Sequence, residues 1–392
     1  MDKSASRQLE TLPPLSLYIH IPWCVKKCPY CDFNSHAAPE QLPEEAYIDA
    51  LISDINAELP QVWGRRLTSI FIGGGTPSLF SAKAFERLLS HIHAVLPGIS
   101  DMEITLEANP GTFEQEKFSD YRQLGINRLS IGIQSFNDQY LSSLGRIHSG
   151  FEARRAIDMV HKAGFENFNL DLMYALPGQS TADVLSDLKT ALDCQPTHLS
   201  QYQLTIEPNT YFHSHTPKQL PENDLIWEMQ DNSQSLLTEY GFEQYEVSAY
   251  AQSGKHSRHN MNYWQFGDYL GIGAGAHAKI SQANNNRIFR TSKLKQPKAY
   301  MQYAGTDSAI NQQHDISTEQ MDFEFMLNAL RLKSGFKPEL YAEHTGQTLA
   351  SIQPKLDLAE SKGLLEISGQ IIKPTQQGFL FLNDLQMIFL ND

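Results

Sequence analysis

Cysteine is scarce in this sequence, with four among 392 residues. So few thiols exclude a secreted scaffold built on disulfides, because such scaffolds pack many cysteines into a short chain. No apolar run approaches the roughly 18 residues that a membrane-spanning helix needs. The opening stretch, MDKSASRQLETLPPLS, also lacks the apolar segment of a signal peptide. We therefore expect a cytoplasmic protein without a membrane span.

Positive charge is also in short supply. The chain has 31 Lys and Arg against 45 Asp and Glu, a net charge of −14. This excess of acid argues against a nucleic-acid partner, because a phosphate backbone is bound by clustered cations. The densest basic run is RIFRTSKLKQPK, residues 287–298, and we interpret it as a solvated linker.

Six short segments rich in β-branched and apolar residues alternate with segments of helical period. The predicted strands are 15–21, 68–74, 102–108, 128–134, 168–174 and 198–204. The predicted helices between them are 44–58, 81–95, 114–124, 150–163 and 180–192. This alternation is typical of a parallel sheet with right-handed crossovers, in either an open doubly wound sheet or a barrel.

Polar residues at the strand ends favour the barrel. Each predicted strand has polar or glycine residues at or just past its carboxyl end, namely Cys24, 73–76, Glu107, Gln134, Asp171 and Gln201. In a barrel these ends converge on one mouth, where chemistry collects, whereas in an open sheet they spread along an edge.

The rest of the chain predicts a smaller second unit. We divide the sequence into a tail (1–14), a barrel core with an extension (15–280), a linker (281–304) and a C-terminal unit (305–392). The extension includes a helix over 223–240 and a strand over 242–248. The last unit shows three helical segments, a hairpin and a helix, the order of a winged helix. Its 6 basic and 12 acidic residues, a net −6, oppose DNA binding and favour a packing or lid role.

Three of the four cysteines lie together in YIHIPWCVKKCPYCDFNSH, as C-x3-C-x2-C over Cys24, Cys28 and Cys31. A zinc ion would need a fourth ligand, from His20, His36 or Cys194. An iron–sulfur cluster held by three thiolates would keep one iron open, as a catalytic site requires. The spacing favours the open cluster, and zinc or redox thiols remain the alternatives.

The flanking residues resemble the radical S-adenosylmethionine superfamily. The motif directly follows the first predicted strand, Tyr30 precedes the last cysteine, and GGGTPS follows the second strand. The resemblance implies a partial (β/α)6 TIM-like barrel in which Cys24, Cys28 and Cys31 ligate three irons of a [4Fe–4S] cluster. It also implies that the amine and carboxylate of S-adenosylmethionine chelate the fourth iron. Glycines suit such a turn because they let backbone groups approach a ligand closely.

Further motifs are similar to the oxygen-independent coproporphyrinogen III dehydrogenase group. They are YIHIPWC, GGGTPS, EANPGT, RLSIGIQSF, LGRIHS and NLDLMYALPGQS. The likeness implies that Tyr18, Gly74, Gly75, Thr76 and Glu107 surround a first S-adenosylmethionine and that Tyr30 also contacts a cofactor. It implies that Gln134, Arg146 and Asp171 surround a second.

Two departures from that enzyme group point to a sister group, the HemW-type haem chaperones. The enzymes carry a fourth cysteine where this chain has Phe33, and only 23 residues precede Cys24. The sister group also carries H-N-x-x-Y-W, present here as HNMNYW from His259 to Trp264 and followed by YLGIGAGAHA, which contains His277.

The HNMNYW motif predicts haem contacts. A neutral imidazole can ligate haem iron, so we expect His259 to be the axial ligand. Tyr263 and Trp264 are flat and apolar with a donor at the tip, which suits a porphyrin face or edge. A structural turn around a buried Trp is the competing interpretation. His213 and His215 are weaker candidates, and Cys194 is expected to be a core thiol.

We therefore predict a haem chaperone that binds haem, one [4Fe–4S] cluster and one or two molecules of S-adenosylmethionine, and passes haem to an acceptor protein. A reductant such as flavodoxin is a further expected partner. The alternative is an oxygen-independent coproporphyrinogen III dehydrogenase, disfavoured by Phe33, the short N-terminus and HNMNYW. A radical methylase or RNA modifier is disfavoured by the negative charge and the absence of extra cysteines. No catalytic residue is assigned.

Overall fold

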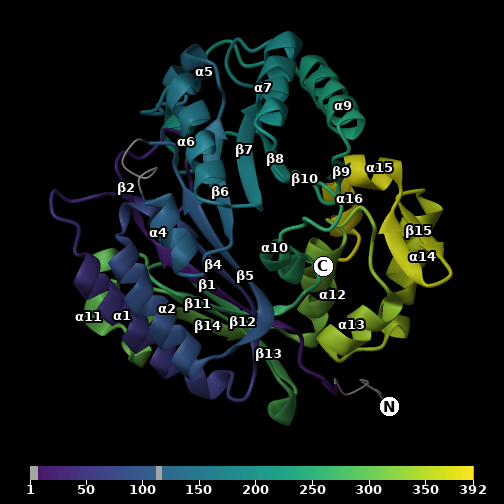
Figure 1. The fold of residues 1–392 in the computed structure, drawn as a ribbon. Coiled ribbons are helices and arrows are strands. Elements are labelled where there is room, and N and C mark those ends of the chain that lie inside the picture. The colour runs from purple at the N-terminus through teal and green to yellow at the C-terminus, as the bar shows by residue number, and fades with distance from the viewer. Residues whose placement is uncertain (1–7, 112–116, 392) are drawn as a thin grey trace, which may run out of the picture.

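A 12-stranded sheet forms the centre of the protein in a computed structural model that describes residues 8–111 and 117–391 (Figure 1). The six predicted strands are β1 (Leu15–Ile21), β4 (Leu67–Gly74), β5 (Gly98–Ala108), β6 (Arg128–Gln134), β7 (Phe168–Tyr174) and β8 (His198–Gln203). They lie side by side in this order and pair in parallel. This confirms the predicted α/β class with a parallel barrel-type sheet.

Six further strands extend the sheet on both sides. Beyond β8 lie β10 (Ala249–Ala251) and β9 (Glu243–Gln244), and beyond β1 lie β11 (Asp268–Ile272), β12 (His277–Gln282), β13 (Arg287–Lys293) and β14 (Ile310–Asp315). β11 pairs in parallel with β1, whereas β12, β13 and β14 pair antiparallel. The strand predicted over 242–248 is therefore only the short β9.

The central strands are buried because both of their faces are covered. In β1 every residue except Tyr18 is buried, as expected for a parallel strand between layers. Helices α1 (Glu44–Glu58), α2 (Ala82–Val95), α4 (Phe118–Gln123), α6 (Gly150–Lys162), α7 (Thr181–Asp193) and α9 (Asn223–Glu239) lie along the outside of the sheet (Figure 1). Residues 114–116 of the helix predicted over 114–124 lie outside the described residues.

Serine caps start several helices at the positions that the sequence indicates. Ser180 accepts a hydrogen bond from the Asp183 amide and completes a capping box at the start of α7. Ser149 and Glu152 form the same motif at α6. Each cap satisfies amide groups that have no partner inside the helix.

The structure corrects the predicted linker over 281–304. These residues include all of β13 and of α11 (Pro297–Tyr303), and β13 pairs with strands on both sides. Lys293 is only 3% exposed, and its Nζ lies 2.7 Å from Asp54 and 2.5 Å from Glu58 on α1. Lys293 therefore forms buried ion pairs and does not belong to a solvated linker.

The C-terminal unit contains three helices and a hairpin in the expected order, followed by two short helices where one was expected. It comprises α12 (Thr318–Ala329), α13 (Pro338–Thr345), α14 (Gln353–Ser361), the hairpin β15 (Leu365–Ser368) and β16 (Ile371–Pro374), α15 (Gln376–Leu380) and α16 (Leu382–Met387). Its core, which includes Phe325, Tyr341 and Leu356, also contains Phe266 and Ile288 from the barrel side. The unit therefore packs directly on the barrel, on the right of Figure 1. β14, inside the predicted 305–392 unit, belongs to the large sheet.

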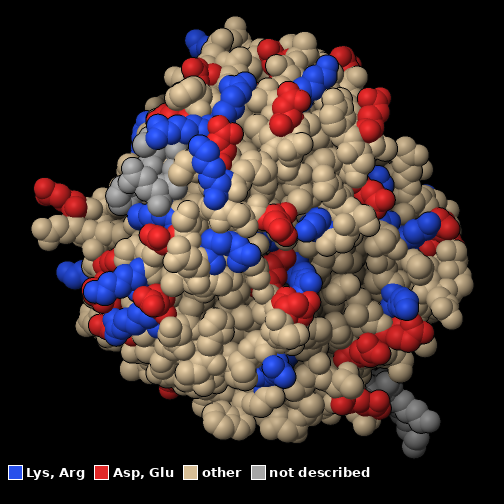
Figure 2. Space-filling view, in the orientation of Figure 1, with Lys and Arg blue, Asp and Glu red and all other residues tan. Residues whose placement is uncertain are grey.

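Charge is dispersed on the face drawn in Figure 2. Blue and red side chains intermingle there, and neither sign forms a continuous patch. Among the helices described, none has the length and apolar character to span a membrane.

Candidate functional site

The cysteine motif lies on a loop directly after β1. A short parallel ladder of β2 (Trp23–Cys24) and β3 (His36–Ala37) closes this loop, and the Ala38 amide donates to the Cys24 carbonyl. All three thiols are free and partly exposed. Backbone pairing therefore holds them together without a disulfide.

This loop fits an iron–sulfur cluster. Within residues 8–111 and 117–391, no three His, Cys, Asp or Glu side chains converge as ligands of a single metal ion. A cluster instead places each thiolate on a different iron, so neighbouring but separate free thiols suit it. Arg146 Nη1 lies 3.5 Å from Cys28 Sγ, where it can donate to a thiolate.

The glycine turn after β4 packs against this loop. Gly74 has φ +115°, and a Cβ there would lie 2.5 Å from the His20 ring. A Cβ at Gly75 would lie 2.5 Å from the Trp23 carbonyl oxygen. The amides of Gly75 and Thr76 donate to the carbonyls of Ile21 and Trp23. Both glycines are thus required by the close approach of β1 and the cysteine loop.

Tyr18 connects β1 to the cysteine loop through His20. His20 Nε2 donates to the Asn34 carbonyl at 2.9 Å, so Nδ1 accepts from Tyr18 Oη at 2.9 Å. Burial lowers the pKa of His20, which keeps this imidazole neutral. The arrangement fixes the segment that follows Cys31.

Glu107 and Asp171 place two carboxyl groups in the barrel mouth. Glu107 Oε2 accepts from the Gly74 amide at 3.0 Å. Burial and the nearby Asp171 raise the pKa of Glu107 to about 8. Asp171 accepts from Ser130 and Asn169, and burial raises its pKa as well.

Glu107→Gln is expected to weaken the pH dependence of stability. The Glu107 pKa is about 8 when folded and 4.5 ordinarily, so the free energy of unfolding of the parent falls as pH rises from about 4.5 through 8. Gln keeps an acceptor for the Gly74 amide and does not titrate. Denaturant unfolding should therefore show a larger gain for the variant at pH 8 than at pH 5. Glu40→Gln, at an exposed carboxylate, is the control, and an equal gain at both pH values would contradict the expectation.

Gln134 Nε2 and Arg146 Nη2 both lie next to Gly132 of β6. Gln134 has φ +67° at a register shift between β6 and β7. A positive φ strains the backbone of any residue other than glycine, and such strain occurs often at functional positions. Arg146 Nη2 donates to Asn109 Oδ1 at 2.6 Å, and Asn109 Nδ2 donates to Thr76 Oγ1 at 2.8 Å. Asn109 therefore links residues predicted for the first and the second cofactor. Tyr30 lies beside Arg146 and Cys28.

The HNMNYW motif forms most of a short helix, α10 (Arg258–Trp264). His259 is 1% exposed. Its Nδ1 donates to Ser69 Oγ at 3.0 Å, because that hydroxyl donates in turn to Ser16, and its Nε2 accepts from Tyr263 Oη at 2.9 Å. Burial lowers the His259 pKa to about 3. Both ring nitrogens are thus occupied, and this placement does not favour the axial role predicted for His259.

His259→Ala is expected to lower the free energy of unfolding by about 3 kcal/mol, because it leaves a cavity and two buried hydroxyls without their partner. Tyr263→Phe removes one of these bonds and should cost about 1 kcal/mol. Urea unfolding measures both effects. The control is His213→Ala, at an exposed position of the short helix α8 (Tyr211–Ser214). If His259→Ala unfolds at the same urea concentration as the parent, the structural role of His259 is contradicted.

A cavity of about 530 Å³ joins the predicted site residues from distant segments. This central cavity is lined by Tyr18, Gly74 and Glu107 from the barrel, Phe33 and Asn34 from the cysteine loop, and Tyr263 and Trp264 from α10. His277 from β12 and Leu327 from α12 also line it. Its volume lies in the range of about 300–1,000 Å³ typical of small-molecule sites.

The remaining predicted residues lie outside the lining of the central cavity. They are Cys24, Cys28, Cys31, Tyr30, Gly75, Thr76, Gln134, Arg146, Asp171 and His259. His213 and His215 are also outside it. Cys194 ends α7 and packs against the main core.

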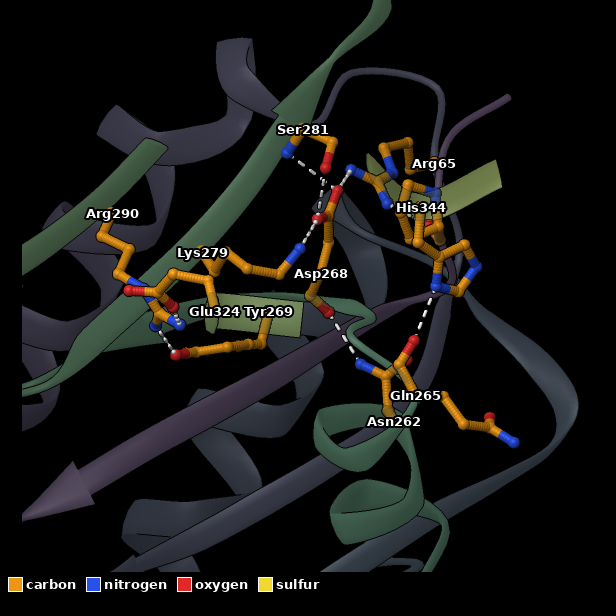
Figure 3. Close-up of polar contacts among 11 residues, drawn as sticks. Arg65, Asn262, Gln265, Asp268, Tyr269, Lys279, Ser281, Arg290, Glu324 and His344 are labelled. Atoms are coloured by element: carbon orange, nitrogen blue, oxygen red, sulfur yellow. Dashed lines mark hydrogen bonds and ion pairs between the residues drawn. The ribbon is translucent and has the colours of Figure 1, made fainter. Parts of the chain in front are cut away.

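Sequence reasoning missed the basic wall of the central cavity. Lys279, Arg290 and Lys295 line it, and the last two lie in the run that was interpreted as a linker. Lys279 Nζ lies 2.9 Å from Asp268, which Arg65 also contacts (Figure 3). The β-branched and aromatic residues around Arg290, namely Ile288, Phe289 and Thr291, were the available signal for a strand.

Comparisons with known proteins define the class. The Radical SAM superfamily matches residues 18–191, and the HemN C-terminal domain family matches residues 316–381. The fold is similar to that of coproporphyrinogen III oxidase (HemN) from Escherichia coli, with a TM-score of 0.81 and 22% identity over 98% of this chain and 95% of the other. The protein therefore has the radical SAM fold, and the superfamily implies a [4Fe–4S] cluster and S-adenosylmethionine.

Curated relatives define the family. The chain is 47% identical to "Heme chaperone HemW" of Escherichia coli (strain K12) over 97% of this chain and 99% of that protein. It is 35% identical to the protein of the same description in Bacillus subtilis (strain 168) over 96% of this chain and 99% of that protein. The chain belongs to the HemW family.

Proposed function

We propose that this protein is a haem chaperone, which binds haem in the central cavity and passes it to an acceptor protein. The observation that carries the proposal is the 47% identity to a heme chaperone over almost the entire length of both chains. The central cavity supports it, because the cavity joins the cysteine loop to the motif that distinguishes this group.

Cys24, Cys28 and Cys31 are the residues we assign to one [4Fe–4S] cluster, which supplies one-electron chemistry when bound. Tyr18, Gly74 and Glu107, on the same side of the central cavity as the cysteine loop, are assigned to S-adenosylmethionine. Gln134, Arg146 and Asp171 are the candidates for a second molecule.

His277 is the imidazole that we assign to the haem iron. It is exposed, lines the central cavity and has no ring hydrogen bond to the described residues. Burial and the nearby Lys295 and Arg290 lower its pKa, which favours the neutral form that ligates iron. His259 acts instead by holding Tyr263 in the cavity wall.

Trp264 and Phe33 provide the flat apolar surface for the porphyrin. Phe33 is 61% exposed and lines the central cavity. The Arg331 guanidinium carbon lies over the Trp264 ring, 4.2 Å from the ring centroid. The Trp264 Nε1 is buried without a hydrogen-bond partner among the described residues. An apolar ligand with polar edges would cover both aromatic side chains.

A one-electron donor such as flavodoxin is the proposed source of electrons. We place this exchange in the cytoplasm. No step in it requires a nucleic acid.

The test is the absorption spectrum of anaerobically reconstituted protein before and after addition of haem. We expect a Soret shift that saturates at one haem per chain, transfer of that haem to an added haem-free b-type cytochrome, and no decarboxylation of coproporphyrinogen III. Decarboxylation without haem binding would replace the chaperone by the dehydrogenase alternative.

A further inference from the structure

The β12–β13 wall of the central cavity presents cations on one face. Lys279 and Arg290 are directly opposite each other across the antiparallel pair, and His277 lies two residues before Lys279 on the same face. Opposed like charges destabilise a sheet unless each is neutralised. A wall with this composition therefore needs anions.

Two of the cations are neutralised within the protein. Lys279 is buried and pairs with Asp268 at 2.9 Å, over the Phe266 ring. Arg290 pairs with Glu324 of α12 at 2.5 Å and donates to Tyr269 Oη at 2.9 Å (Figure 3). Lys279 is held in the interior, whereas both partners of the Arg290–Glu324 pair remain one-quarter exposed.

Lys295 is the cation without an internal anion. Its side chain is exposed, lines the central cavity and makes no ion pair with the described residues. Its backbone is fixed, because Asn34 Nδ2 donates to the Lys295 carbonyl at 2.9 Å. The backbone that bears this ammonium group is therefore fixed at the point where the cysteine loop meets the basic wall.

We propose that this wall is a carboxylate-binding site, in which Lys295 and Arg290 bind the propionate carboxylates of the tetrapyrrole. In the absence of the ligand, Glu324 pairs with Arg290 in their place. The inference rests on the proposed function and adds the orientation of the ligand. The carboxylates face β13, and the ring lies toward Trp264 and His277. Because Glu324 belongs to the C-terminal unit, ligand binding exchanges one contact between that unit and the barrel for a contact with the ligand.

A carboxylate in the central cavity has two sources, the tetrapyrrole and the methionyl group of S-adenosylmethionine. The experiment separates them with three ligands: haem, haem dimethyl ester and S-adenosylmethionine. Haem and its ester are titrated by Soret absorbance in one co-solvent, and S-adenosylmethionine is measured by equilibrium dialysis. The full-length reconstituted protein is used throughout.

Lys295→Gln and Arg290→Gln should each weaken haem binding about tenfold, the scale of a hydrogen bond to a charged group. Binding of the ester and of S-adenosylmethionine should change less than about twofold, because neither loses that bond. Glu324→Gln should tighten haem binding, since it removes the competing anion from Arg290. Lys298→Gln, at an exposed lysine of α11 outside the cavity lining, is the matched control and should bind all three like the parent.

Equal affinity of the parent for haem and its ester would overturn the inference while leaving the proposed function intact. The inference would also be overturned if Lys295→Gln lost affinity only for S-adenosylmethionine, because the site would then bind the methionyl carboxylate. Failure of the parent to bind either tetrapyrrole would instead overturn the proposed function. Lys295→Gln removes no ion pair or side-chain hydrogen bond with the described residues and keeps the carbonyl that accepts from Asn34, so it keeps the test decisive even where Arg290→Gln reduces folding.

Discussion

Cys28→Ala is expected to abolish the broad visible absorption of the reconstituted protein and its bound iron and sulfide, and Cys24→Ala and Cys31→Ala should do the same. Each thiolate is assigned to a separate iron, and a cluster that already has one open iron cannot lose a second ligand and persist. Loss should therefore be nearly complete in each single variant.

The fold should survive these substitutions. The loop is closed by the β2–β3 ladder and by the Ala38 amide, neither of which involves a thiol. Far-ultraviolet circular dichroism of the variants should match that of the parent without cluster. Cys194→Ala is the matched control, because this thiol lies at the C-cap of α7, where it packs against the main core outside the motif. A single variant of the motif that retains four irons and four sulfides per chain would refute the cluster assignment.

His277→Ala is expected to weaken haem binding at least about tenfold, or about 1.4 kcal/mol. The substitution removes the imidazole that faces the central cavity, so only stacking and carboxylate contacts remain. The Soret and visible bands should change with the coordination state of the iron, and cluster content should stay constant because His277, on β12, is not one of the thiolate ligands.

Two other substitutions separate ligation from stacking. Trp264→Ala should weaken haem binding by about 1 kcal/mol through the loss of stacking, which is less than the effect of His277→Ala. The spectrum of the remaining complex should stay unchanged. His259→Ala should act mainly on stability, because it removes the buried hydrogen bonds to Ser69 and Tyr263. If His277→Ala binds haem with the affinity and spectrum of the parent while His259→Ala does not, the axial role returns to His259, and α10 must rearrange on binding.

The order and type of the central elements were predictable from local sequence. Strands such as β1 and β7 are buried on both faces, so their apolar residues form nearly continuous runs bounded by turns. Helix α7 starts at the Ser180 cap, which is a local signal. The cysteine motif is equally local, because C-x3-C-x2-C places three thiols on one short loop whatever the surrounding fold.

Tertiary structure alone decided the other half of the site. The sequence by itself determined the class of fold, the cysteine loop and the resemblance to a family, because these depend on residues close together in the chain. It could not show that Lys293 is buried against Asp54, that both nitrogens of His259 are bonded, or that Arg290 faces Glu324, since each partner lies on another element. A charged or titratable side chain takes its environment from whatever packs beside it, and that environment is set by strand order and domain packing rather than by neighbours in sequence.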